Sequence, residues 1–264
     1  MLASLSPTRR RFVLALAGLV VAALAVVGFV AIGHATSRVG PVSQAEQGPV
    51  LLVSGYGGDT ASLEPLARAL EAQGRDATIV PPVSGGTGDL RAQAARLGEA
   101  ADAARSRTGA ASVDVVGYSA GGVVARLWVS DFGGDGVARR VVTLDSPHHG
   151  TDVASLALET VPGQCPLACQ QLAPDSPLLA SLNAGDETPT GPRFVSIWSD
   201  TDEVVTPPDS ARLEGALDFT VQDVCGNVDL SHGQVPGSPL VLAAVPRLLG
   251  VDNPAVPPAA LCRR

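Results

Sequence analysis

Short apolar runs alternate with helix-like segments along most of the chain. Six runs have the length of strands, and they lie at residues 50–53, 77–80, 112–116, 140–144, 194–198 and 216–221. The first of them is apolar throughout, which is typical of strands that are buried on both faces of a parallel sheet. The pattern predicts buried strands rather than strands with one face in water.

Helical periodicity separates several of these runs. Apolar residues at Leu63, Leu66, Ala67 and Leu70 predict a helix over residues 60–73, with Thr60 as its N-cap. Further helices are expected at residues 89–107, 123–130 and 240–249. Strands that alternate with helices over some 200 residues indicate an α/β fold, in which a doubly wound, mostly parallel sheet carries helices on both faces.

The N-terminal part has a different character. Arg9, Arg10 and Arg11 precede an uncharged apolar run at residues 12–33, whose 22 residues are enough to span a bilayer as a helix. The basic cluster predicts that residues 1–11 stay in the cytoplasm and that the rest of the chain is exported. A signal anchor is favoured by the length of the run, and a cleaved signal peptide is the alternative.

Beyond that segment, composition suggests three further regions. Residues 34–48 are polar and lack apolar periodicity, which predicts a stalk between the membrane and the folded domain. The domain itself is expected at residues 49–250, followed by a proline-containing tail at 251–264. Residues 161–191 hold five prolines and no clear periodicity, which predicts an irregular connection that is either a lid or binding loop or a surface insertion without a role.

Charge excludes one class of partner. Residues 49–264 hold 14 arginines against 25 acidic residues, a net charge of −11. Such a domain is repelled by nucleic acid and by anionic lipid headgroups. We therefore expect no nucleic-acid partner.

One stretch carries a chemical signature. Residues 112–124 contain Gly117-Tyr118-Ser119-Ala120-Gly121 between a strand and a segment that can form a helix. This strand, sharp turn and helix form the context in which a serine is exposed as a nucleophile, and small flanking residues are needed because the turn is crowded. Ser119 is the predicted nucleophile.

A serine nucleophile needs a histidine base and a carboxylate that holds the histidine in the correct tautomer. In chains with this kind of turn, the acid and then the histidine follow the serine. His232 comes after the last predicted strand and fits that order, whereas His148 and His149 precede the acidic candidates and are interpreted as residues that support a turn. The acid is expected after the strand at 194–198, where the candidates are Asp200, Asp202 and Glu203.

The negative oxygen of a tetrahedral intermediate needs two hydrogen-bond donors. One is expected to be the backbone N–H of Ala120, which follows the nucleophile. The other is expected from the glycine-rich turn after the first strand, where the N–H of Tyr56 lies between Gly55 and Gly57. No metal and no cofactor is expected in this chemistry.

Taken together, these segments resemble the bacterial extracellular lipases and esterases of the α/β-hydrolase fold. The matching stretches are residues 53–58, 117–122, 145–151, 196–205 and 231–233. The resemblance implies hydrolysis of esters by a triad of Ser119, Asp202 and His232, with Asp200 as the alternative acid. The sequence departs from the family at Ser54, where the family usually has a histidine before the first glycine of the oxyanion turn.

All four cysteines lie in the part of the chain that is expected to be exported, which favours disulfides. Three pairings are possible, and we favour Cys165 with Cys169 and Cys225 with Cys262. A zinc site is not expected, because neither cysteine pair has a histidine at ligand spacing.

The sequence therefore predicts a serine ester hydrolase that acts on lipid or other carboxylic esters and is either tethered to the membrane by its N-terminal helix or secreted after cleavage of that segment. Two alternatives remain: an acyltransferase that uses the same acyl-enzyme, and an inactive hydrolase fold that serves as a binding module of the cell envelope.

Overall fold

The computed structural model describes residues 40–263. The basic segment at 1–11, the apolar segment at 12–33 and the first part of the expected stalk lie outside these residues. Within residues 40–263, no helix combines the length and the apolar character that crossing a bilayer requires. The chain from Pro41 onward forms one compact unit.

The last residues of the expected stalk lie against this unit. The N–H of Val42 donates to the carbonyl of Gly191 at 3.2 Å. The side chains of Gln44 and Gln47 donate to the carbonyls of Arg139 and Leu249, at 2.9 and 2.7 Å. Part of the 34–48 stretch is thus attached to the domain.

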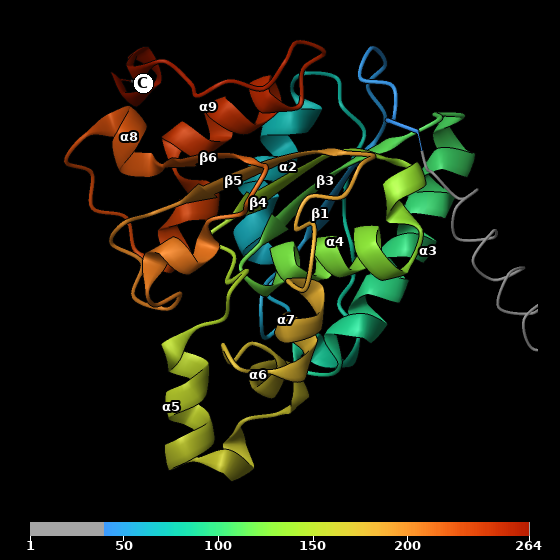
Figure 1. The fold of residues 1–264 in the computed structure, drawn as a ribbon. Helices are drawn as coiled ribbons and strands as arrows, with labels where there is room; N and C mark the ends of the chain where they lie inside the picture. Colours follow the sequence, from blue (N-terminus) through green and yellow to red (C-terminus); the bar gives the residue numbers. More distant parts are fainter. Residues whose placement is uncertain (1–39, 264) are drawn as a thin grey trace, which may run out of the picture. The chain divides into compact units, whose positions relative to one another are not determined.

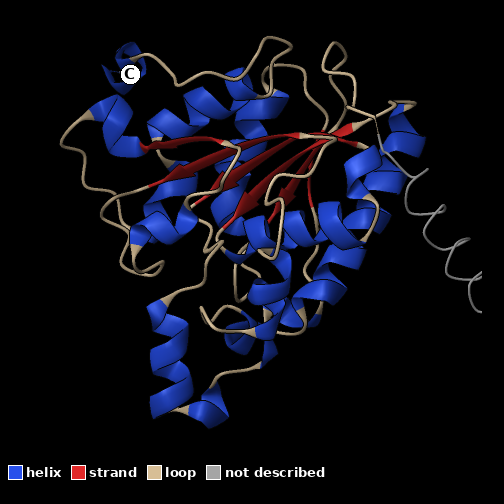
Figure 2. Cartoon of the chain, in the orientation of Figure 1, coloured by secondary structure: helices blue, strands red, loops and turns tan. Residues whose placement is uncertain are grey.

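In the described residues, six strands form one sheet in the order β2-β1-β3-β4-β5-β6 (Figures 1 and 2). Every neighbouring pair is parallel. The strands are β1 (Val50–Val53), β2 (Ala77–Ile79), β3 (Val113–Tyr118), β4 (Ala138–Leu144), β5 (Arg193–Trp198) and β6 (Leu217–Thr220). Because all strands run the same way, the loops that follow them meet at one edge of the sheet, where ligands of such sheets bind.

Helices cover both faces of the sheet, as the sequence predicted (Figure 1). The α-helices of the described residues are α2 (Glu64–Glu71), α3 (Leu90–Thr108), α4 (Ala120–Asp131), α5 (Asp152–Thr160), α6 (Leu167–Gln171), α7 (Pro177–Leu182), α8 (Val221–Cys225) and α9 (Pro239–Leu248). Helices α5 and α6 lie beyond the edge of the sheet and not on its faces. Leu51 and Val53 of β1 pack with α3 and α4, whereas Val50 and Leu52 pack on the opposite face with α2 and α9. Successive side chains of a strand point to opposite faces, so this apolar run fills two cores at once.

Two expectations about local structure were wrong. Thr60 does not cap the first helix, because its backbone is already helical, and the carboxylate of Asp59 accepts the N–H of Ala61 at 2.9 Å instead. Residues 161–191 are not irregular throughout, since they contain α6 and α7. Ser176 caps α7 by accepting the N–H of Leu179 at 3.2 Å.

The chain has two disulfides, which join Cys165 with Cys169 and Cys225 with Cys262. This is the pairing that we favoured from the sequence. The second disulfide connects the end of α8 to a 3₁₀ turn at Ala259–Arg263, and Leu261 of that turn is buried against the core. The C-terminal tail is therefore fastened to the segment that leads to His232.

We expect the double variant Cys225→Ser, Cys262→Ser to be less stable and less active than the wild type. The bridge spans 37 residues. Chain-entropy estimates for a loop of that size give about 3 to 4 kcal/mol, which corresponds to a fall in Tm of roughly 10 °C for a domain of this length. Thermal unfolding and ester hydrolysis, measured on the same samples, test this. An unchanged Tm would show that the bridge contributes nothing to the stability of the domain.

Candidate active site

Ser119 lies between β3 and α4 in a strained turn. Its backbone has φ +54° and ψ −128°, a conformation that residues other than glycine seldom adopt. The turn needs glycine on both sides. A Cβ at Gly117 would lie 2.5 Å from the carbonyl oxygen of Gly121, and one at Gly121 would lie 2.2 Å from the carbonyl oxygen of Val53.

The structure brings His232 and Asp202 to this serine. His232 Nε2 lies 3.0 Å from Ser119 Oγ, and His232 Nδ1 lies 2.6 Å from Asp202 Oδ2. All three residues are buried. The hydrogen-bonded chain from carboxylate to imidazole to hydroxyl is the arrangement that lets the imidazole accept the serine proton.

Backbone donors fix the carboxylate of Asp202. Its Oδ1 accepts the N–H groups of Val204 and Val205, at 2.7 and 2.9 Å, which leaves Oδ2 to face the imidazole. Asp200, the alternative acid, is exposed, and in the described part of the chain its side chain makes no hydrogen bond. The geometry therefore places Asp202, and not Asp200, beside His232.

Two contacts to the backbone of His232 were not foreseen from the sequence. The hydroxyl of Tyr118 donates to the His232 carbonyl at 3.1 Å, and Glu203 accepts the His232 N–H at 3.1 Å. Both residues adjoin a predicted site residue, Ser119 or Asp202. That adjacency was the available signal, but only the folded chain shows that they hold the histidine.

A third carboxyl group, that of Asp145, also lies next to the histidine. Asp145 follows β4 directly, is fully buried, and has φ +44°. Its Oδ1 accepts the N–H of Ser199 at 2.8 Å, and its Oδ2 lies 3.9 Å from His232 Nδ1. Burial, with a smaller contribution from the nearby Asp202 carboxylate, raises the pKa of Asp145 well above its usual range.

Asp145, Asp202 and His232 are also the described residues whose possible metal-ligand atoms lie within 4.8 Å of one another. The short hydrogen bond between His232 Nδ1 and Asp202 Oδ2 explains why these atoms are so close. Asp202 and His232 belong to the hydrogen-bonded chain, and Asp145 lies beside it without a hydrogen bond to either residue.

The two residues expected to bind the oxyanion lie next to Ser119. A Cβ on Gly55 would lie 2.8 Å from the Ser119 Cβ, so the backbone that leads into Tyr56 passes close to the nucleophile. Among the described residues, the N–H groups of Tyr56 and Ala120 have no hydrogen-bond acceptor. Two unpaired donors close to the serine are available for a negatively charged oxygen.

His148 and His149 take no part in this arrangement. His148 is fully buried, its Nε2 lies 3.0 Å from Thr143 Oγ1, and burial lowers its pKa well below the usual range, which keeps the ring neutral. His149 Nε2 lies 2.7 Å from Glu187. Both residues belong to the turn that follows β4, and neither lines the pocket beside Ser119.

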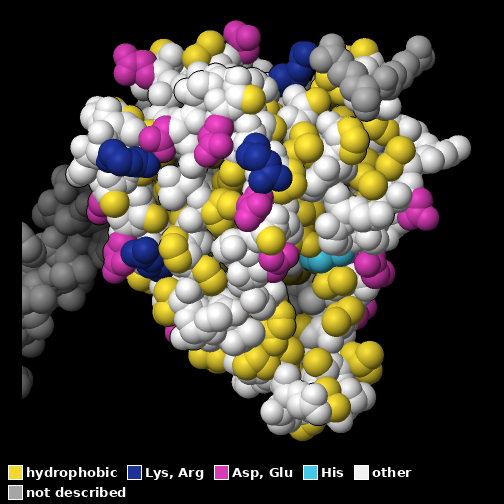
Figure 3. Space-filling view, turned by 180° about the vertical axis from the view of Figure 1, so that it is seen from behind, with side chains coloured by type: hydrophobic (Ala, Val, Ile, Leu, Met, Phe, Trp, Pro, Cys, Tyr) yellow, Lys and Arg dark blue, Asp and Glu magenta, His cyan; other side chains and the backbone are white. Residues whose placement is uncertain are grey.

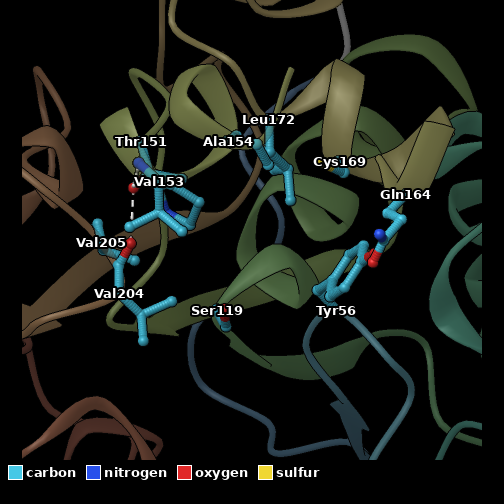
Figure 4. A pocket seen from close by; sticks show the side chains of 12 residues that line it. Tyr56, Ser119, Thr151, Val153, Ala154, Gln164, Cys169, Leu172, Val204 and Val205 are labelled. Carbon is cyan, nitrogen blue, oxygen red and sulfur yellow. Dashed lines mark hydrogen bonds between the residues drawn. The ribbon is translucent and has the colours of Figure 1, made fainter. Parts of the chain in front are cut away.

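Ser119 opens into a largely apolar pocket of about 220 Å³ (Figure 4). Helix α5 provides one wall through Val153, Ala154 and Ala157. The other lining residues are Tyr56, Pro147, Thr151, Gln164, Cys169, Leu172, Val204 and Val205. The disulfide Cys165–Cys169 thus supports part of the pocket wall.

Exposed hydrophobic side chains occur on the elements that surround this pocket. They are Tyr56, Val153, Leu156, Val161, Leu167 and Val204, which are between 38% and 60% exposed. Figure 3 shows hydrophobic side chains over much of the face in view, including the lower part, where α5 and α6 lie. Both the pocket and its surroundings are suited to an apolar ligand.

Comparison with known proteins agrees with this geometry. The family model described as "Lipase (class 2)" matches residues 100–235, just over half of the chain. A search of curated proteins gives no match.

Among solved structures, the mature form of the Bacillus licheniformis lipase BlEst2 superposes with a TM-score of 0.66 at 18% identity, covering 80% of this chain and 96% of that one. Aspergillus fumigatus lipase B gives a TM-score of 0.68 at 17% identity, covering 84% of this chain and 58% of that one. At these identities the likeness establishes the fold.

Proposed function

The chain belongs to the class 2 lipase family and is a carboxylic ester hydrolase, and we propose that Ser119, His232 and Asp202 carry out its reaction on lipid esters. The observation that supports this most directly is the continuous hydrogen-bonded chain from Asp202 through His232 to Ser119, at the mouth of an apolar pocket. An intact chain of this kind also argues against the inactive binding module.

In the first half of the proposed reaction, Ser119 Oγ attacks the ester carbonyl carbon while its proton passes to His232 Nε2. The carbonyl oxygen becomes negatively charged, and the N–H groups of Ala120 and Tyr56 donate to it. The positive charge that develops on His232 is stabilised by the Asp202 carboxylate. His232 then returns the proton to the alcohol oxygen as the ester bond breaks, and an acyl-enzyme remains on Ser119.

In the second half, a water molecule replaces the alcohol. It loses a proton to His232 Nε2 as its oxygen attacks the acyl carbon, and the collapse of the second tetrahedral intermediate releases the acid. His232 gives the proton back to Ser119 Oγ, which restores the starting state. The same three side chains therefore serve both halves, and no group outside the chain is consumed other than ester and water.

The acyl chain is proposed to occupy the pocket between α5 and the turn after Asp202. Most of its lining residues are alanine, valine, leucine or proline, and none is charged, so the pocket offers an alkyl chain mainly apolar contacts. Burial of each methylene group contributes about 0.8 kcal/mol. A lipid ester gains more from such a pocket than an ester of a short polar acid.

We further propose that this domain works outside the cytoplasm. Two disulfides form more readily in an oxidising compartment, and the sequence before residue 40 has the features of a signal anchor or signal peptide. Protease treatment of intact cells, followed by separation of membrane and medium, tests this. A domain that stays protected from protease would contradict it.

Labelling with a fluorophosphonate probe tests the proposed nucleophile. We expect the probe to react at one serine, and peptide mapping should place the adduct on Ser119. Competition by a long-chain nitrophenyl ester should slow the labelling. A folded protein that hydrolyses esters but carries the probe on another residue would refute the assignment of Ser119.

The variant Ala157→Phe is expected to shorten the acyl chains that the enzyme accepts. In the wild type, kcat/KM should rise by up to about fourfold for each added methylene, the factor that corresponds to 0.8 kcal/mol, until the pocket is filled. A phenyl ring at residue 157 would fill part of the pocket, so the rise should stop at a shorter chain.

The matched control for that variant is Leu156→Phe, which places the same ring on the neighbouring residue of α5. Leu156 is 60% exposed and does not line the pocket. Rates for nitrophenyl acetate, butyrate, hexanoate and octanoate measure both profiles. If the two variants give the same chain-length profile, the acyl chain does not bind along α5.

A further inference from the structure

Asp145 is a buried carboxyl group that no step of the proposed reaction uses. Its Oδ2 is buried and has no hydrogen-bond partner among the described residues. An unsatisfied buried oxygen is costly, and such groups are uncommon in native proteins. This oxygen nevertheless lies 3.9 Å from His232 Nδ1, the atom that donates to Asp202.

We propose that Asp145 is a reserve acid for the triad, able to accept the Nδ1 hydrogen bond of His232 when Asp202 is absent. The role is that of a positioning residue, because Asp145 would act on the substrate only through His232. The inference rests on the proposed function of Ser119 and His232 and extends it to a carboxyl group from a different strand.

Geometry supports this role. Asp145 follows β4 and Asp202 follows β5, and these strands are neighbours in the sheet, so the two carboxyl groups reach the same imidazole from adjacent strand ends. The bond from the Ser199 N–H to Asp145 Oδ1 fixes one oxygen and leaves Oδ2 on the side of His232. A shift of about 1 Å would bring Nδ1 and Oδ2 within hydrogen-bond distance.

The charges around Asp145 explain why it does not compete with Asp202 in the intact enzyme. The titratable groups that face it are Asp202, Glu203, Tyr118 and His232. Burial and the two neighbouring carboxylates raise the pKa of Asp145, which favours its neutral form while Asp202 is charged. Loss of the Asp202 charge removes one of these causes, so Asp145 ionises more readily in a variant that lacks the Asp202 carboxylate.

The test compares two replacements of Asp202 that differ in what they leave beside His232. In Asp202→Asn, the amide occupies the space and offers a donor to Nδ1. In Asp202→Ala, the space is empty, and the imidazole can tilt toward Asp145. We expect kcat/KM of Asp202→Ala to exceed that of Asp202→Asn roughly tenfold or more, since the loss caused by an asparagine in a related triad is about 10⁴-fold.

The decisive variant is Asp145→Asn, alone and combined with Asp202→Ala. Asparagine tolerates positive φ and keeps an oxygen for the Ser199 N–H, so the fold should persist. Alone, Asp145→Asn is expected to change kcat/KM less than about fivefold, because Asp202 still holds His232. In the Asp202→Ala background, it should remove the remaining advantage over Asp202→Asn.

A pH profile separates this role from a merely structural one. Asp145 must lose its proton to accept a hydrogen bond from Nδ1. The limb of the pH profile over which kcat/KM of Asp202→Ala rises should therefore lie at higher pH than the corresponding limb of the wild type. The limb should be absent from the double variant. A general loss of stability would lower activity without moving this limb.

Asp218 provides the matched control. It is a half-buried aspartate that, like Asp145, has one oxygen bound to a backbone N–H, that of Leu213, and one oxygen without a partner among the described residues. In the described structure its carboxylate makes no contact with His232. Asp218→Asn in the Asp202→Ala background should therefore leave kcat/KM unchanged.

If Asp202→Ala does not fold, Asp202→Ser replaces it, because a serine hydroxyl can still accept the N–H of Val204. Equal activity with and without Asp145 in this background would overturn the inference. Such a result, with an inactive Ser119→Ala, would leave the proposed triad intact. Activity that survives Ser119→Ala would refute the triad itself.

Discussion

Replacement of Ser119 by alanine is expected to abolish ester hydrolysis without unfolding the domain. The change removes the attacking oxygen, and in a well-studied serine enzyme the same change lowers kcat about 10⁶-fold. His232 then has no hydroxyl to deprotonate, although the unpaired N–H groups of Ala120 and Tyr56 remain. Any residual hydrolysis should proceed at the rate at which water attacks an ester that is bound in the pocket and polarised by those two donors.

The fold should tolerate this change, because the backbone conformation at residue 119 is set by the turn and does not depend on the hydroxyl group. Its hydroxyl makes one hydrogen bond in the described structure, to His232. Thermal unfolding of purified Ser119→Ala, compared with kcat for a nitrophenyl ester, separates loss of activity from loss of structure. Ser130→Ala, at the far end of the same helix α4, is the control that removes an exposed hydroxyl and should keep full activity. Activity near the wild-type value in Ser119→Ala would reject the mechanism.

The site could be predicted where it depends on local sequence. The strained turn at Ser119 needs glycines two residues away on either side, and the contacts at Gly117 and Gly121 show why a larger residue cannot replace them. His232 followed from the order of residues along the chain. For the turn at Ser119 a short stretch contains the whole signal, because the backbone geometry is set within a few residues, whereas His232 needed the order of the segments along the chain.

Asp145 could not be recognised in this way. Its contact with the Ser199 N–H joins residues 54 positions apart, and its distance to His232 depends on how β4 and β5 are paired. The sequence alone identifies Asp145 only as one residue of a turn that follows a predicted strand. Only the parallel register shows that this turn delivers a second carboxyl group to the imidazole of the triad.

The short helices between residues 152 and 182, two of which line the pocket, were missed for a different reason. Helices α6 and α7 are five and six residues long, too short for a repeating apolar pattern to be visible. Helix α5 has nine residues, and its apolar side chains are divided between the protein interior and the exposed surface. The wall of the pocket is therefore the part of the site that the sequence described least well, and its role as a lid stays a prediction.

The acid of the triad is tested by two substitutions two residues apart. Asp202→Asn is expected to lower kcat about 10⁴-fold, the loss measured for the equivalent change in the best-studied triad, whereas Asp200→Asn should leave kcat nearly unchanged. Asp200 is exposed and has no contact with His232 in the described structure. Both variants remove one negative charge from the same turn, so they differ in position and not in net charge.

The structure explains why an asparagine at residue 202 would be so harmful. The N–H groups of Val204 and Val205 both donate to Oδ1 of Asp202, so in the variant they would select the amide oxygen for that place. The amide NH₂ would then take the place of Oδ2, 2.6 Å from His232 Nδ1 in the present structure, and donate to it. The imidazole would be held with its proton on Nε2, where it cannot accept the proton of Ser119. Measurement of kcat for both variants at matched stability decides the assignment, and a greater loss in Asp200→Asn would move the acid to Asp200.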